Sequence, residues 1–274
     1  MKKITGIFIL SFFLLFLFSC KNSNTTTVTE KENKNHVENK KEHKDCKDVH
    51  WSHHKGEEGP ENWKNLCDGF KDCGGKSQSP IDIQTTNVKN DKELSSPEFH
   101  YSDSKVDIIN NGHTVQFNVT GDNFVKLNGK DYKLLQFHYH ALSEHTIDGK
   151  HFPMEVHFVH KNSDSDFAVI GAMIKEGKPN QLFEKYLEHF PTDKGEYKSD
   201  ETFNILNLLP ENKSYFYYSG SLTTPPCSEV VNWYVLKTPI EASKDQIVKF
   251  SKILNNNYRP VMPLNGRAVE LFNE

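Results

Sequence analysis

Short segments in which apolar and polar residues alternate place the strongest constraint on how this chain can fold. Val115, Phe117 and Val119 are separated by single polar residues. Successive side chains of a strand point to opposite faces of a sheet, so this pattern predicts a strand with one buried face. Two denser apolar runs, 167–174 and 230–236, are expected to be central strands.

Turn and helix signals separate these segments. Asn-Gly at 128–129 and Asp-Gly at 148–149 are typical of tight β-hairpin turns. Apolar residues recur at helical spacing in 182–190 and 247–254, and a capping-box pattern precedes the second of these segments. The sequence therefore predicts one β-dominated domain with a few peripheral helices.

The N-terminus has the pattern of an export signal. Lys2 and Lys3 precede an almost wholly apolar stretch, 4–18, which is too short for a resident membrane helix. It ends in Leu-Phe-Ser-Cys, which resembles the bacterial lipobox and predicts cleavage before Cys20 with lipid on its thiol. An ordinary signal peptide is the alternative, but no Ala-x-Ala-like site lies nearby. We interpret residues 1–19 as a lipoprotein signal peptide.

The next segment is strongly polar. Between residues 21 and 44, the apolar residues are Val28 and Val37. Such a segment cannot bury enough surface to offset the entropy lost on ordering. We therefore expect a flexible lipid-anchored linker over 20–45 and a globular domain over 46–274. The protein would be exported and anchored in the bacterial cell envelope, facing the periplasm or the cell surface.

The charge balance argues against a nucleic-acid partner. The formal net charge is −4, and removal of residues 1–19 takes away two lysines and no acidic residue, which gives −6. Nucleic-acid binding would call for a basic excess. The sequence leaves the oligomeric state open, with a homodimer as one alternative.

The cysteine count is consistent with export. Of five cysteines, four remain once Cys20 carries lipid. An even number in an oxidising compartment favours disulfides, and three pairings are possible. No CxxC motif is present, so a cysteine zinc site is a poor alternative. The four are Cys46, Cys67, Cys73 and Cys227.

Three histidines form a candidate metal site. His138 and His140 are two residues apart, so in a strand they project from the same face. His157 would join them if its segment is the neighbouring antiparallel strand. Three imidazoles and a water make the open tetrahedral site of catalytic zinc. Cation-scavenging and cupin-type iron sites use similar spacing, but Gln136 and Glu155, each two residues before a candidate ligand, are placed to orient the ligands.

The segment Gln136-Phe137-His138-Tyr139-His140 resembles the zinc signature of the α-carbonic anhydrases. Other family segments follow in order from about Trp51 to Arg267, which covers nearly all of the globular part. These segments are Gly59-Pro60 with Trp63, Gln78-Ser79-Pro80-Ile81, Asn111-Gly112-His113, Ser143-Glu144-His145-Thr146-Ile147-Asp148-Gly149, Glu155-Val156-His157-Phe158-Val159-His160, Ser221-Leu222-Thr223-Thr224-Pro225-Pro226 and Tyr258-Arg259-Pro260.

The resemblance implies the α-carbonic anhydrase fold, which is mainly β (α+β). We expect a large, twisted, mostly antiparallel central sheet of about ten strands with a few short peripheral helices. It also implies zinc-dependent, reversible hydration of carbon dioxide to bicarbonate and a proton, by attack of a zinc-bound hydroxide. A non-catalytic binding module on the same fold and a zinc esterase are the alternatives.

The resemblance also implies roles for individual residues. One Zn²⁺ per chain would be bound by His138, His140 and His157. Thr223 would accept a hydrogen bond from the zinc-bound hydroxide and donate its own proton to Glu144. His113 matches the proton shuttle of the family.

Further implied roles concern orientation and substrate binding. Gln136 would orient His138, Glu155 would orient His157, and the backbone carbonyl of Asn257 would orient His140. Bicarbonate would be steadied by the backbone N–H of Thr223 and the side chain of Thr224. The apolar wall that holds carbon dioxide matches Val159, Val169, Leu222, Val231 and Trp233.

Three further comparisons with the family concern cysteines and departures from the pattern. Cys73 and Cys227 match the disulfide pair of exported members, which leaves Cys46 and Cys67 as the second pair. The family often has a Tyr shortly after Trp51 that helps to organise active-site water. Here the segment 52–55 is Ser-His-His-Lys, with one extra residue before Gly59, so proton transfer is where this chain is expected to differ.

Overall fold

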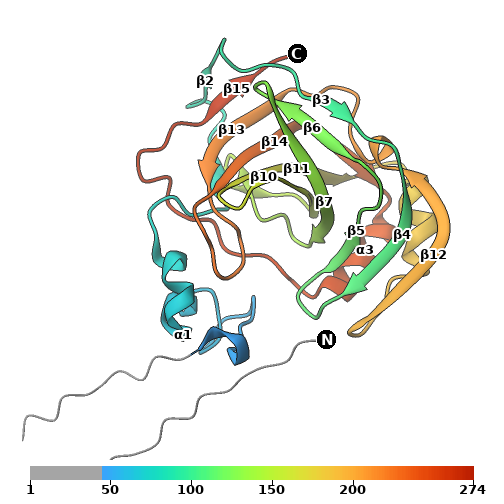
Figure 1. Ribbon diagram of the computed structural model, residues 1–274, viewed down its shortest axis with the longest axis horizontal. Coiled ribbons are helices and arrows are strands. Elements are labelled where there is room, and N and C mark those ends of the chain that lie inside the picture. The colour runs from blue at the N-terminus through green and yellow to red at the C-terminus, as the bar shows by residue number, and fades with distance from the viewer. Residues whose placement is uncertain (1–44) are drawn as a thin grey trace, which may run out of the picture. The chain divides into compact units, whose positions relative to one another are not determined.

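One large twisted sheet organises the domain. The computed structural model describes residues 45–274, and the predicted signal peptide, Cys20 and the linker up to residue 44 lie outside the described residues. The sheet has twelve strands (Figure 1). In spatial order they are β12 (Gly195–Asn204), β4 (Asp103–Asn110), β5 (Val115–Asn118), β7 (Lys130–His140), β10 (Met154–Ser163), β11 (Asp166–Glu176), β14 (Val231–Ala242), β13 (Tyr215–Gly220), β15 (Glu270–Phe272) and β2 (Lys89–Asn90), while β6 (Phe124–Leu127) pairs with β7 and with β3 (Glu98–His100).

The expectation of a mostly antiparallel sheet is confirmed. Neighbouring strands are antiparallel except for β11 with β14 and β15 with β2, which are parallel. The sheet has twelve strands rather than about ten, because β2 and β3 contain only two and three residues. Segments this short carry no readable alternation in the sequence. A separate three-stranded sheet contains β1 (Asp82–Ile83), β8 (Thr146–Ile147) and β9 (Lys150–His151).

Both predicted hairpin turns are present. Asn128 and Gly129 connect β6 to β7 with φ values of 48° and 78°. Asp148 and Gly149 connect β8 to β9 with φ values of 50° and 74°. Positive φ at both central residues is the geometry that Asn-Gly and Asp-Gly favour in two-residue hairpin loops.

The predicted helices form at the periphery of the sheet. The second of them, α3, begins with the predicted capping box, in which Ser243 and Gln246 exchange side chain–backbone hydrogen bonds. The ring centroids of Phe183 and Phe250 are 5.2 Å apart, which packs α2 against α3 over the core. The helical elements are α1 (Trp63–Leu66), α2 (Gln181–Leu187) and α3 (Lys244–Leu254), with 3₁₀ turns at Cys46–Asp48, Asp68–Gly74 and Ile205–Leu208.

Strand β11 separates two hydrophobic cores. Ala168 and Ile170 belong to the larger core, which α2 and α3 cover, whereas Val169 and Met173 belong to a smaller core. Because successive side chains alternate across a strand, the two cores lie on opposite faces of the sheet. The smaller core is the one that adjoins the candidate site.

A β-bulge in β7 changes which face its side chains reach. Val159 of β10 pairs with Gln136, but the next residue, His160, pairs with Leu134. Leu135 therefore has no pairing partner on β10. Without the extra residue, Leu134 and the residues at 136, 138 and 140 would share one face. The bulge instead puts Leu134 on the same face as Phe137, and both pack in the larger core. The histidines of β7 lie on the opposite face.

Both disulfides are present as predicted. Cys73 is bonded to Cys227, and Cys46 is bonded to Cys67. The first bond fastens the loop after β13 to the N-terminal part of the domain, and the second fastens the start of the described chain to the end of α1.

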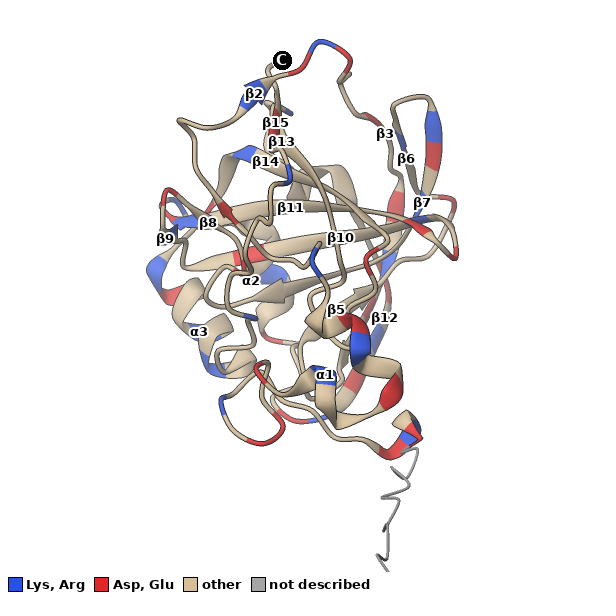
Figure 2. Ribbon diagram, turned by 90° about the vertical axis from the view of Figure 1, so that its left-hand side faces the viewer, with Lys and Arg blue, Asp and Glu red and all other residues tan. Residues whose placement is uncertain are grey.

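Charged side chains are distributed along most of the described elements. Lysine and arginine alternate with aspartate and glutamate on helices, strands and loops (Figure 2). Within residues 45–274, no helix is long and apolar enough to cross a membrane.

Candidate metal centre and active site

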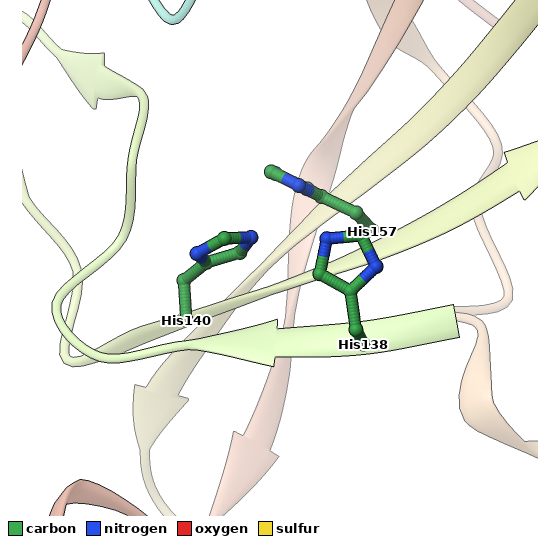
Figure 3. A group of neighbouring side chains, drawn as sticks. All are labelled: His138, His140 and His157. Carbon is green, nitrogen blue, oxygen red and sulfur yellow. The ribbon is translucent and has the colours of Figure 1, made fainter. Parts of the chain in front are cut away.

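Three histidines from two neighbouring strands converge on one point. His157 of β10 pairs directly opposite His138 of β7, and antiparallel partners project from the same face. His140 lies two residues further along β7 on that face. One ligand nitrogen from each ring lies within 4.8 Å of the other two. Figure 3 shows the three rings turned toward a shared space.

Each ring of β7 is held through its Nδ1 atom. Nδ1 of His138 lies 2.8 Å from Oε1 of Gln136. Nδ1 of His140 lies 2.6 Å from the backbone carbonyl oxygen of Asn257. Both acceptors require a proton on Nδ1, which leaves the lone pair on Nε2 of each ring. The structure thus contains both of the orienting contacts that the sequence predicts here.

The ring of His157 is turned the other way. Its Nε2 atom lies 2.9 Å from Oε1 of Glu155, and its Nδ1 atom lies 3.8 Å from Oε2 of Glu144. Glu155 itself is fully buried and accepts hydrogen bonds from the backbone N–H groups of Glu144 and His145, each at 2.9 Å. A Cβ atom on Gly171 would lie 2.9 Å from Oε1 of Glu155, so glycine gives the carboxylate its space.

Burial and neighbouring charges set the protonation of these groups. Burial lowers the pKa of His138 and of His140, and the neighbouring His157 adds to both shifts. Burial alone would raise the pKa of Glu155, but His145 and His157 hold it well below its usual range. Burial alone would lower the pKa of His157, but the Glu155 carboxylate raises it above the ordinary histidine value. The site therefore combines the neutral imidazoles of His138 and His140 with a buried negative charge behind His157.

His145 and His160 are buried in the core. Nδ1 of His145 lies 2.8 Å from Glu155 Oε1, and its Nε2 lies 2.7 Å from the hydroxyl of Tyr218. Nε2 of His160 is hydrogen-bonded to the hydroxyl of Tyr101. His145 and Glu155 form a second group of possible ligand atoms with His157, but the contacts above already engage both of them.

Glu144 lies beside the histidine group. Its Oε1 atom accepts a hydrogen bond of 2.8 Å from the backbone N–H of Arg259. Its Oε2 atom is buried without a hydrogen-bond partner, 3.6 Å from Nε2 of His140. Thr223 is also buried, but residues 45–274 show no hydrogen bond from Thr223 to Glu144, so this contact stays a prediction.

Arg259 is a positioning residue of the site. The sequence predicted no role for it. Its guanidinium donates to Gln78 Oε1 and to the carbonyl of Ser79, each at 2.8 Å, and to the carbonyl of Cys73 at 3.1 Å. Burial lowers its pKa to about 10. Arg259 thus joins Glu144 to the disulfide-bonded segment at Cys73. Only its position between Tyr258 and Pro260 marked it in the sequence.

The five predicted apolar wall residues gather beside the histidines. All belong to the smaller core or pack against it, and the ring of Trp233 lies 4.9 Å from the ring of His157. Thr224 lies in the adjoining loop, where its carbonyl accepts a 2.9 Å hydrogen bond from the N–H of Cys227. The wall residues are Val159, Val169, Leu222, Val231 and Trp233.

A cavity of about 390 Å³ is lined among others by His53, His113 and Asn257. His113 lies on the loop between β4 and β5 and stacks on Trp51 with ring centroids 3.8 Å apart. Burial lowers the pKa of His113, and Lys194 and His50 lower it further. The predicted shuttle residue therefore lies on the wall of a cavity that is also lined by Asn257, the residue whose carbonyl holds His140.

The donor set matches zinc. Neutral imidazole nitrogens suit Zn²⁺, and three of them leave a fourth tetrahedral position for water or substrate. Nε2 of His140 is buried without a hydrogen-bond partner in the described part of the chain, as expected of an atom placed for a metal ion. The acceptors behind the rings are the outer contacts that such sites use to fix their ligands.

Comparison with known proteins agrees with this geometry. The model of eukaryotic-type carbonic anhydrases matches residues 58–273. The chain belongs to this family. A carbonic anhydrase from Nostoc is 43% identical over 230 residues, covering 82% of this chain and 86% of the relative. One from Klebsiella pneumoniae is 43% identical, covering 80% and 90%.

Solved structures extend the comparison. The α-carbonic anhydrase from Thermovibrio ammonificans, in complex with the inhibitor sulfanilamide, is 42% identical with a TM-score of 0.78, covering 81% of this chain and 99% of that one. Dioscorin in complex with ascorbate is 28% identical with a TM-score of 0.76, covering 82% and 98%. The carbonic anhydrase fold thus occurs with more than one kind of ligand, and function must be argued from the site.

Replacement of Gln136 by alanine tests the orienting contacts. Gln136→Ala frees the ring of His138, so we expect the zinc dissociation constant to rise about 10- to 100-fold. Competition with a chromogenic chelator measures this constant. Gln181→Ala, the same change at an exposed position of α2, is the matched control. Equal zinc affinity in the two variants would contradict the role of Gln136.

Proposed function

We propose that this carbonic anhydrase holds one zinc ion through His138, His140 and His157 and hydrates carbon dioxide reversibly to bicarbonate and a proton. The observation that carries the proposal is the convergence of three histidine nitrogens, each ring held from behind by a separate acceptor. The similarity to curated carbonic anhydrases supports the reaction.

The chemistry explains why the site has these residues. Carbon dioxide is an uncharged, weak electrophile, so the reaction needs a strong nucleophile beside an apolar surface. Bound zinc would lower the pKa of water and supply hydroxide near neutral pH, an effect for which carbonic anhydrase itself is the standard example. Val169, Val231 and Trp233 provide the buried apolar surface.

Thr223 and Glu144 would orient the reacting oxygen. A carboxylate accepts hydrogen bonds only, and a hydroxyl can donate one and accept one. If Thr223 donates to Glu144, its oxygen must accept from the nucleophile, which turns a lone pair toward carbon dioxide. Support comes from the unpartnered Oε2 atom of Glu144, which leaves an acceptor position open for such a donor.

The proton released in each turnover needs an acceptor near the cavity. His113 lies on the cavity wall and its pKa lies below the ordinary histidine value. A histidine that titrates near neutral pH can accept a proton and release it to buffer. We assign His113 this transfer role.

The proposal is tested by stopped-flow measurement of carbon dioxide hydration on the oxidised protein. We expect fast hydration that is lost on zinc chelation, returns with zinc, and is abolished in His138→Ala, which lacks one ligand. His189→Ala, on an exposed histidine outside the site, should retain full activity. Stoichiometric zinc without hydration would overturn the enzymatic proposal and favour the binding module, while ester hydrolysis that exceeds hydration would favour the zinc esterase.

We also propose that the enzyme is exported and anchored in the cell envelope through lipid on Cys20. The lipobox-like sequence and the two disulfides of the domain support this. In a bacterial host, a metabolic fatty-acid label should enter the wild-type protein, and Cys20→Ser should abolish labelling and release the protein from the membrane fraction. Labelling that persists in Cys20→Ser would contradict the anchor.

A further inference from the structure

One wall of the cavity is built by the segment 45–57, to which Trp51, His53 and His54 belong. This segment is fastened by the Cys46–Cys67 disulfide and by a 3.0 Å hydrogen bond from Trp63 Nε1 to the carbonyl of Ser52. His53 lies within this segment. Trp63 Nε1 also donates to the carbonyl of Glu58 at 3.1 Å, so the chain is held both before and after His53.

The ring of His53 lies near both a proposed metal ligand and His113. Its centroid is 6.5 Å from that of His140 and 6.4 Å from that of His113. It packs edge-on against Trp51 at 5.2 Å and Trp63 at 6.0 Å. Two tryptophans thus hold the imidazole at the point where the cavity approaches the metal ligands.

A polar atom of this ring has no partner in the protein. Nε2 of His53 is buried and makes no hydrogen bond to any residue between 45 and 274. Buried polar atoms in native proteins are paired with protein or with ordered water, because leaving one unpaired is costly. The cavity that His53 lines has a volume of about 390 Å³, which holds several water molecules. Water is therefore the available partner of Nε2.

Burial favours the neutral form of the His53 imidazole. A neutral imidazole offers one donor and one acceptor nitrogen in fixed directions. Such a group can orient water without storing a proton itself.

We propose that His53 is a positioning residue for proton release: its imidazole orients the cavity water through which a proton passes from the metal centre to His113. The proton lost by the attacking water moves along this water to His113 and then to buffer, and His53 ends each cycle unchanged. The inference rests on the proposed function and adds a residue from the segment 52–55, where the sequence departs from the family pattern.

The test uses His53→Phe, which keeps an aromatic ring but removes both nitrogens. It is made in the full chain, zinc-loaded and oxidised, and carbon dioxide hydration is followed over a range of buffer concentrations. Because kcat/KM reports the steps through bicarbonate formation, it should stay within about twofold of wild type. At low buffer, kcat should fall about tenfold, as the loss of one hydrogen bond implies, and concentrated imidazole buffer should restore it.

Two further variants complete the test. His53→Gln keeps a polar group and should retain most of the low-buffer kcat. His54→Phe makes the same substitution at the adjacent exposed histidine and should behave as wild type. An unchanged low-buffer kcat in His53→Phe would overturn the inference, and so would an equal fall in kcat and kcat/KM at full zinc occupancy in both His53 variants. Absence of hydration in the wild-type protein would instead refute the proposed function.

Discussion

The pairing of β7 with β10 is the constraint on which the rest of the site depends. His138 lies opposite His157, and Glu155 lies opposite His140, so the two strands supply the three proposed ligands and two orienting groups, Glu155 and Gln136. A slip of one residue would turn every side chain of β7 to the other face of the sheet. The bulge at Leu135 shifts the faces within the strand: Leu134 and Phe137 fill the larger core, while the histidines lie on the opposite face.

Buried charges connect this pair of strands to the loops around the site. Glu155 receives backbone donors from Glu144 and His145, which fixes the segment after β7. The backbone of Arg259 donates to Glu144, and its guanidinium reaches the carbonyl of Cys73. Cys73 is bonded to Cys227, which follows the Thr223 loop. A continuous set of covalent and hydrogen bonds therefore runs from the histidine group to the loop proposed to orient the nucleophile.

The sequence was most informative where function depends on short spacing. The two-residue steps from Gln136 to His138 and from Glu155 to His157 predicted contacts that the structure contains, because strand geometry makes i and i+2 share a face. The Asn-Gly and Asp-Gly turns could likewise be predicted, because the two residues of each turn determine its geometry. The family resemblance supplied the long-range contact between His140 and Asn257, which no local pattern could give.

Features that depend on distant packing could not be predicted. The bulge at Leu135 has no sequence signal of its own, since it follows from how Leu134 and Phe137 fill the core. The three acceptors of Arg259 lie more than a hundred residues away in sequence. The position of His53 depends on Trp51 and Trp63. The extra residue in 52–55 marked this segment as different from the family. Only the structure shows that the ring of His53 lines the cavity.

The fold is shared with a protein solved in complex with ascorbate, so the central claim concerns the site: three histidines bind zinc and leave its fourth position open. The most direct measurement is the X-ray absorption spectrum of the zinc-loaded protein at the zinc edge. Our account predicts three imidazole nitrogens at about 2.0–2.1 Å and one further oxygen that is exchangeable water. A site closed by a fourth protein ligand, such as the nearby carboxylate of Glu144, or a shell without three imidazoles, would contradict it.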